Sequence, residues 1–119
     1  MTKEQLRAHI FESYGISPDY PFENDFETAV YRHPHNKKWF ALSMTIPKSK
    51  LGLAGEELID VVNIKCAQEI IPDLWQEAGL FPAYHMNKRH WLTVALDGSA
   101  EDGTVLWLTG MSFELTRGR

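Results

Sequence analysis

Residues 38 to 46 read Lys38-Trp39-Phe40-Ala41-Leu42-Ser43-Met44-Thr45-Ile46, and this stretch decides the fold class. Side chains alternate along it with the period of a β-strand, and the more apolar side carries Phe40, Leu42, Met44 and Ile46. Before it, residues 27 to 31 are rich in β-branched and aromatic side chains, and His33-Pro34-His35-Asn36 has the composition of a turn. The two segments therefore predict a β-hairpin.

A helix is expected on the N-terminal side of this hairpin, over residues 3 to 14. Thr2 and Gln5 fit a capping box, and Gly15 is a suitable stop. Between them runs an apolar stripe at helical spacing, formed by Leu6, His9, Ile10 and Phe11.

On the C-terminal side of the hairpin, residues 47 to 55 predict a loop and residues 57 to 65 a third strand. Pro72 cannot sit deep inside a helix, so residues 67 to 78 divide into a short turn and a helix with Pro72 near its first turn. Its buried side is expected to be Leu74, Trp75 and Ala78. Residues 91 to 96 predict a strand, and residues 100 to 115 a helix with an apolar stripe at Val105, Leu106, Leu108, Met111 and Leu115.

This order of elements predicts an α+β fold, with an antiparallel sheet and helices packed on one face. The length of 119 residues sits at the commonest domain size, so residues 1–119 are expected to form a single domain. Hydrophobic residues make up 44% and charged residues 24%, which are ordinary globular values.

The cysteine content, the N-terminal charges and the apolar runs together indicate a cellular compartment. Cys66 is the only cysteine, so no internal disulfide is possible. The charged N-terminus does not resemble a secretory signal, and no apolar run approaches the roughly 20 residues of a membrane-spanning helix. A cytoplasmic protein without a membrane partner is expected.

The distribution of charge is uneven. The net charge of −4 argues against a general affinity for phosphate backbones. However, residues 28 to 50 carry five cations and no acid, and residues 78 to 96 carry two cations and no acid. Such asymmetry predicts a basic face.

Catalytic and metal-binding patterns are weak. The histidine pairs lack the helical four-residue spacing of a metal site, so turn and surface positions are expected for them. Cys66 follows an apolar strand, where packing is its expected role. The serines lack a nucleophile elbow, and no glycine-rich phosphate loop is present. We therefore expect no catalytic residue, no metal and no cofactor, and a protein that is not an enzyme.

The densest group of functional side chains is Tyr84-His85-Met86-Asn87-Lys88-Arg89-His90-Trp91. Cations can neutralise phosphates, Asn can read base edges, and aromatic rings can stack on unpaired bases. An exposed basic turn between two core aromatics explains the same residues.

This block resembles the His-Met-Asn-Lys-x-His-Trp signature of the MmcQ/YjbR proteins, through His85, Asn87, Lys88, His90 and Trp91. Val62-Asn63-Ile64-Lys65-Cys66 is similar to the Asn-Leu-Lys-Cys strand end of that family, and Leu96-Asp97-Gly98 to the pattern after it. The resemblance spans about residues 2 to 115. It implies a CyaY-like α+β fold whose hairpins form a double-wing motif, and it implies DNA binding.

Three functions follow as hypotheses. The first is a DNA-binding module whose contacts are Arg32, Lys37, Lys38, Lys48, Lys50, Lys65, Lys88 and Arg89. The second is a protein-interaction or small-ligand module centred on His85, Asn87, His90 and Trp91. The third, iron binding in the manner of frataxin, ranks last because the first helix has only Glu4 and Glu12 as acids. The oligomeric state and any preferred nucleic-acid sequence stay open.

Overall fold

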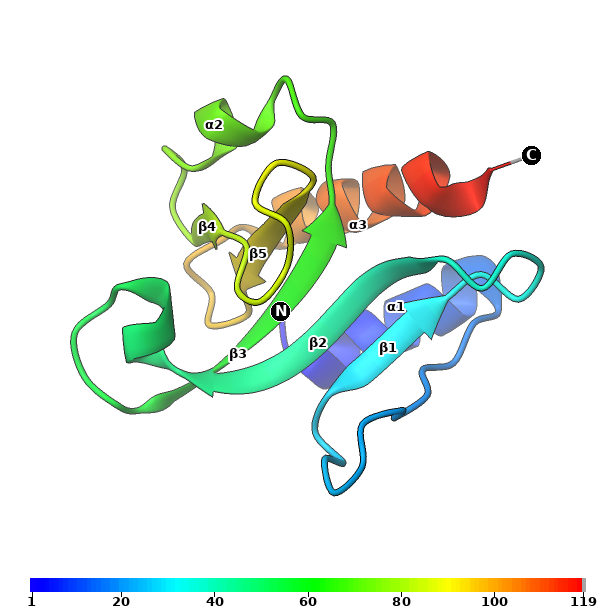
Figure 1. Cartoon of the computed structure of the whole chain (residues 1–119), viewed down its shortest axis with the longest axis horizontal. Coiled ribbons are helices and arrows are strands. Elements are labelled where there is room, and N and C mark those ends of the chain that lie inside the picture. The colour runs from blue at the N-terminus through cyan, green and yellow to red at the C-terminus, as the bar shows by residue number, and fades with distance from the viewer. Residues whose placement is uncertain (119) are drawn as a thin grey trace.

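A computed structural model describes residues 1–118 as a five-stranded antiparallel sheet with three helices (Figure 1). The strands lie in the order β1-β2-β3-β5-β4, so β1 and β4 are the outermost strands. In chain order the elements are α1 (Lys3–Tyr14), β1 (Ala29–Arg32), β2 (Trp39–Pro47), the 3-10 turn η1 (Lys48–Leu51), β3 (Leu58–Lys65), α2 (Ile71–Leu74), β4 (Leu80–Pro82), β5 (Trp91–Ala95) and α3 (Asp102–Arg117). The predicted antiparallel sheet and α+β fold are confirmed.

Helix α1 begins and ends where the sequence predicts. The Thr2 hydroxyl accepts a hydrogen bond from the Gln5 amide at 3.0 Å, and the Gln5 side chain accepts one from the Thr2 amide at 2.9 Å. Gly15 ends the helix with a φ of 68°, a left-handed conformation that glycine adopts without strain. The predicted stripe is wrong at Phe11, which is 57% exposed, because the face toward the sheet is set by Leu6 and Ile10.

The main core lies between the sheet and the helices. Figure 1 shows α1 and α3 on the same side of the sheet, and residues of α1, α2 and α3 share one buried cluster with residues of β1, β2, β3 and β5. The predicted packing of helices on one face is confirmed. Along α3, however, the buried face includes the hydroxyl side chains of Thr109, Ser112 and Thr116, whereas Leu115 is 47% exposed.

Ser112 explains why hydroxyl groups are buried on α3. Its Oγ donates to the carbonyl of Phe40 on β2 and accepts a hydrogen bond from the amide of Lys65 on β3 at 2.8 Å. The ladder between β2 and β3 ends at the pair Ala41 and Ile64, so Ser112 supplies the partners that the two strands no longer give each other. Because Ser112 is polar, the apolar pattern of the helix does not predict that this position is buried.

A β-bulge interrupts β2 at Phe40. Tyr31 pairs with Ala41, whereas the next residue, Arg32, pairs with Trp39. Phe40 and Ala41 consequently both belong to the helix-side core, and Trp39 packs on the opposite face with Leu42. The predicted alternation, which put Phe40 on the side of Leu42, is wrong there because one extra residue reverses the faces of the strand.

The other face of the sheet has its own smaller core. Its buried members are Val30, Leu42, Met44, Ile46, Ile59, Val61 and Ala95. Figure 1 shows the connection between β4 and β5 crossing this face, opposite α1 and α3. Side chains of this connection, Tyr84 and Met86, pack on the cluster. A loop, not a helix, therefore shields part of this apolar face.

The segment between β3 and β5 is shorter in helix and richer in strand than predicted. Pro72 lies in the first turn of α2 as expected, but that helix ends at Leu74, and Ala78 is exposed. Strand β4 was not predicted, because three residues ending in Pro82 give no alternation to detect. Across residues 1–118, no helix combines the length and apolar character needed to cross a bilayer.

Candidate nucleic-acid interface

The connection from Tyr84 to Trp91 is anchored by a fully buried asparagine. Asn63 on β3 donates from Nδ2 to the carbonyl of Tyr84 at 2.9 Å, and its Oδ1 accepts from the hydroxyl of Thr93 on β5. The Thr93 hydroxyl in turn accepts the amide of Tyr84 at 2.9 Å. Because a buried amide side chain must be hydrogen-bonded, this closed set of three residues fixes where the connection leaves the sheet.

Asn87 shapes the middle of the connection. Its Oδ1 accepts the amide of Arg89 at 2.8 Å, and its carbonyl accepts the amides of His90 at 3.1 Å and Trp91 at 2.9 Å. This is the hydrogen bonding of an Asx turn. The carbonyl of His90 then accepts the amide of Cys66 at 2.8 Å. Of the predicted signature residues, Asn87 thus builds the turn through its side chain and its carbonyl, and His90 ties it to the end of β3 through its carbonyl.

Antiparallel pairing brings most of the predicted cations to one boundary of the sheet, the one where the strands start or stop, and not to an outermost strand. β1 and β3 end there, and β2 and β5 begin there, as the pairs Arg32–Trp39 and Lys65–Trp91 show. We call this set of predicted contact residues the basic edge; it consists of Arg32, Lys37, Lys38, Lys65, Lys88 and Arg89.

Lys48 and Lys50 are not part of the basic edge. They follow the last residue of β2, in η1, whereas Lys37 and Lys38 precede its first residue. The nine residues of β2 separate the two groups by roughly 30 Å. Lys48 is also paired with Glu57 at 3.7 Å. The predicted strip of eight cations is therefore divided between opposite ends of the sheet.

Two cations of the basic edge already have protein partners. Arg32 Nη2 lies 2.8 Å from Asp19 Oδ2, and its guanidinium carbon lies 5.8 Å from the centre of the Trp39 ring. Lys88 Nζ donates to the carbonyl of Ala83 at 3.0 Å, which ties the connection to β4. Both side chains stabilise their own loops. Within residues 1–118, no acidic side chain forms an ion pair with the other four, Lys37, Lys38, Lys65 and Arg89.

The turn that carries Lys37 and Lys38 is held against the end of α3. His33 is buried, and its Nε2 lies 2.9 Å from the Thr116 hydroxyl. Asn36 Nδ2 donates to the carbonyls of Thr116 and Arg117 at 3.0 and 2.8 Å. Burial, and next the neighbouring His35, lower the pKa of His33. His33 lies at the turn, as expected, but the expectation of a surface position is wrong for it, because it is buried and holds the turn against α3.

The histidines, the acidic side chains and Cys66 are the other residues that could hold a metal ion or act as a nucleophile. Within residues 1–118, no group of three or more His, Cys, Asp or Glu side chains is placed to hold a metal ion. Cys66 belongs to the helix-side core, which confirms its packing role, and burial raises the pKa of its thiol. A thiol that stays protonated is a weak nucleophile.

An apolar groove of about 430 Å³ lies on the loop-covered face of the sheet. Its lining comes from the loop before β1, from β2 and from the connection: Phe22, Asp25, Thr28, Trp39, Leu42, Met44, His85 and Met86. Of the four residues predicted to form a ligand contact, His85 alone lines it; Asn87, His90 and Trp91 do not. Phe22 and Trp39 were not among the predicted site residues. Trp39 shares a face with Leu42 and Met44 only because of the bulge at Phe40.

Comparisons with known proteins agree with this architecture. A family model described as YjbR matches residues 12–115. Uncharacterized protein YyaQ of Bacillus subtilis (strain 168) is 41% identical over 117 residues, which cover 98% of this chain and 99% of that protein. Uncharacterized protein YjbR of Escherichia coli (strain K12) is 37% identical over 54 residues, 44% of this chain and 46% of that one.

Two solved structures share the fold. The crystal structure of a protein from Pseudomonas syringae has a TM-score of 0.96 at 40% identity, covering 98% of this chain and 100% of that one. Deinococcus radiodurans protein DR2400 has a TM-score of 0.74 at 24% identity, covering 99% and 80%, which is a likeness in fold alone. The arrangement of helices and sheet described above is therefore also found in experimental structures.

Proposed function

The chain belongs to the YjbR family, and from that premise we propose that it is a non-enzymatic nucleic-acid-binding module that contacts phosphates through its basic edge. The observation that supports this most is that cations from separate segments of the chain lie at the same edge. Cations from the β1–β2 turn, the end of β3 and the β4–β5 connection meet at one edge, and Lys37, Lys38, Lys65 and Arg89 there lack acidic partners within residues 1–118.

The dimensions of the edge suit a duplex. β2 and β5 lie on either side of β3, so their first residues are on the order of 10 Å apart, which is the scale of a DNA groove. The net charge of −4 repels phosphates from the rest of the surface. Binding should therefore be confined to this edge and should be sensitive to salt.

Paired alanine variants test the proposal at equal net charge. Lys38→Ala with Arg89→Ala removes two basic-edge cations, and Lys48→Ala with Lys50→Ala removes two from the opposite end. Measured by fluorescence anisotropy with a labelled duplex at low salt, the first pair should weaken binding roughly tenfold or more and the second should change it little. Equal losses in both pairs, or no duplex binding by the wild type, would contradict the proposal.

The apolar groove supports a second candidate, a small-ligand module. A volume of about 430 Å³ lies within the usual range of ligand sites, roughly 300–1,000 Å³. Trp39 and Phe22 both line it, with ring centres 6.1 Å apart, and Asp25, Thr28 and His85 add polar groups. This lining fits a planar apolar molecule with at least one hydrogen-bonding group.

Indole is a suitable probe for the groove. Titration followed by NMR should give saturable shifts of the Trp39 indole and of the Met44 and Met86 methyl groups, with none at Met111 on α3. Shifts that spread over the whole protein, or none up to the solubility limit, would reject the second candidate without touching the first.

A further inference from the structure

A cavity of about 170 Å³ lies beside the basic edge, between the segment that follows β3 and the β4–β5 connection. One part of its lining is apolar and comes from α2 and the residue after it, and the other part is polar or cationic. The lining residues are Gln68, Ile71, Pro72, Trp75, Lys88 and Arg89. The volume equals that of roughly five or six water molecules, which is room for one small planar ring and not for a drug-sized ligand of roughly 300–1,000 Å³.

Both walls of this cavity are fixed to the end of the sheet. The amide of Cys66 donates to the carbonyl of His90 at 2.8 Å, and the residue before it, Lys65, pairs with Trp91. On the opposite wall, the amide of Arg89 is held by the Asx turn described above. The cavity therefore keeps its position relative to the cations of the basic edge.

The lining carries two cations and no acid. Neither Lys88 nor Arg89 forms an ion pair within residues 1–118. Lys88 bonds to a neutral carbonyl, so its charge is not compensated. The acids of the neighbouring segment, Glu69 and Asp73, are not among the lining residues. The cavity is therefore an apolar space with uncompensated positive charge beside it.

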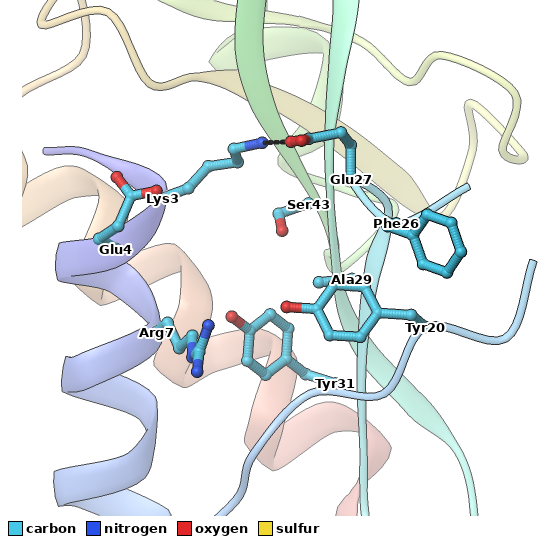
Figure 2. Close-up of a pocket in the computed structure, with 9 residues that line it drawn as sticks. All are labelled: Lys3, Glu4, Arg7, Tyr20, Phe26, Glu27, Ala29, Tyr31 and Ser43. Atoms are coloured by element: carbon cyan, nitrogen blue, oxygen red, sulfur yellow. Dashed lines mark hydrogen bonds and ion pairs between the residues drawn. The ribbon is translucent and has the colours of Figure 1, made fainter. Parts of the chain in front are cut away.

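A second cavity, between α1 and the outer strands β1 and β2, shows the contrast (Figure 2). Lys3 and Arg7 line it, but so do Glu4 and Glu27. Figure 2 shows Lys3 joined to Glu27, and their charged atoms lie 3.1 Å apart. Acids of the protein itself balance the cations there, whereas the cations beside Trp75 are left for an anionic partner.

Trp75 offers the cavity an aromatic ring. The side chain is partly exposed, and it also packs on the helix-side core. Its Nε1 is buried and has no hydrogen-bond partner within residues 1–118, so packing alone orients the ring. The ring can therefore adjust to an occupant without breaking a hydrogen bond. An aromatic ring next to cations is the combination that binds an unpaired base together with its phosphates.

We infer that this cavity takes one unpaired base from a strand whose phosphates lie on the basic edge, so that the preferred ligand is a duplex with a single-stranded extension. The inference rests on the proposed function, because the same edge supplies the phosphate contacts. The ring of Trp75 gives the base an apolar surface, and the amide of Gln68 can both donate to and accept from its polar edge. Arg89 is placed for the adjoining phosphate.

Three ligands separate the base from its phosphates. They are a blunt duplex, the same duplex with a short thymidine extension, and the same duplex with an abasic extension of equal length, each extension being tried at the 3′ and at the 5′ end. By fluorescence anisotropy, the thymidine extension at one of these ends should bind roughly fivefold or more tightly than its abasic counterpart. This ratio should persist as salt is raised, because both ligands present the same phosphates.

Two cavity variants and two matched controls locate the gain. Trp75→Leu should abolish the difference between thymidine and abasic extensions, and Gln68→Ala should reduce it. Trp107→Leu and Gln76→Ala make the same substitutions at exposed positions that do not line the cavity, and should keep it. All four variants should bind the blunt duplex as the wild type does.

NMR of the wild type gives a readout that does not depend on how well Trp75→Leu folds. The thymidine extension should shift the Trp75 indole resonance, and the abasic extension should leave it unchanged. The Trp107 indole on α3 should not respond to either ligand.

Several results would overturn the inference. They are equal affinity for thymidine and abasic extensions at both ends, a Trp75 indole that does not respond to the base, and a gain that both controls lose as well. A gain retained by Gln68→Ala and by folded Trp75→Leu would do the same. Failure of the nucleic-acid proposal is a separate result, because it is read from the blunt duplex, where no base is available to the cavity.

Discussion

Asn63, in the strand end that resembles the family pattern, shows how one buried side chain fixes the connection between β4 and β5. Its side chain joins the carbonyl of Tyr84 to the hydroxyl of Thr93, and all three groups are removed from solvent or nearly so. Asn63→Ala leaves an acceptor and a donor without partners, and should lower the free energy of unfolding by about 2–4 kcal/mol. Urea denaturation measures this, with the exposed Gln76→Ala as control. A loss no larger than the control's would remove Asn63 from this role.

His33 makes stability depend on pH. Its pKa lies below the ordinary value of 6.5, chiefly because of burial. The unfolded chain therefore binds this proton more readily than the folded chain, so the contribution of His33 is full above about pH 6.5 and is lost as the pH falls through the lowered pKa. The free energy of unfolding should fall less between about pH 7.5 and about pH 5 in His33→Gln than in the wild type. Identical pH dependences would contradict this account.

At the scale of elements, α3 is coupled to the sheet through hydroxyl groups as well as apolar packing. Ser112→Ala leaves the Phe40 carbonyl and the Lys65 amide unpaired where β2 and β3 separate. We expect a loss of about 1–3 kcal/mol in the free energy of unfolding, again from urea denaturation. Ser17→Ala, at an exposed position in the loop after α1, is the matched control and should be near neutral. If both variants lost equally little, the contact would be dispensable.

Local patterns predicted the elements but not the departures from them. Alternation in residues 38–46 and the caps at Thr2 and Gly15 are local signals, and the hairpin and α1 follow them. The bulge at Phe40 and the polar contacts of Ser112 depend on residues far away in the chain. Such features arise when the sheet and α3 meet, so no window of sequence contains them.

The candidate site also has a part that the sequence predicts and a part that depends on the topology. The sequence identifies the Tyr84–Trp91 block as a unit. Which of the predicted cations lie near that block could not be known without the strand order. Antiparallel order places Lys65 and Arg89 at one edge and Lys48 at the other. Arg32 and Lys88 are predicted to contact nucleic acid, and the sequence does not reveal that they bind Asp19 and the Ala83 carbonyl.

At the scale of the whole molecule, charge is segregated rather than abundant. An acidic protein of net charge −4 presents cations at one edge of its sheet. If phosphates are bound there, association must release counterions in proportion to the contacts made. The salt dependence of binding therefore counts contacts at the basic edge, independently of how tight the complex is.

The most direct test of the basic edge is the slope of the logarithm of the duplex association constant against the logarithm of salt concentration. For the wild type we predict a linear decrease, and for Lys38→Ala with Arg89→Ala a slope shallower by about 0.9 for each phosphate contact removed. Lys48→Ala with Lys50→Ala should keep the wild-type slope. A slope near zero in the wild type, or the same change in both double variants, would contradict the assignment of nucleic-acid binding to this edge.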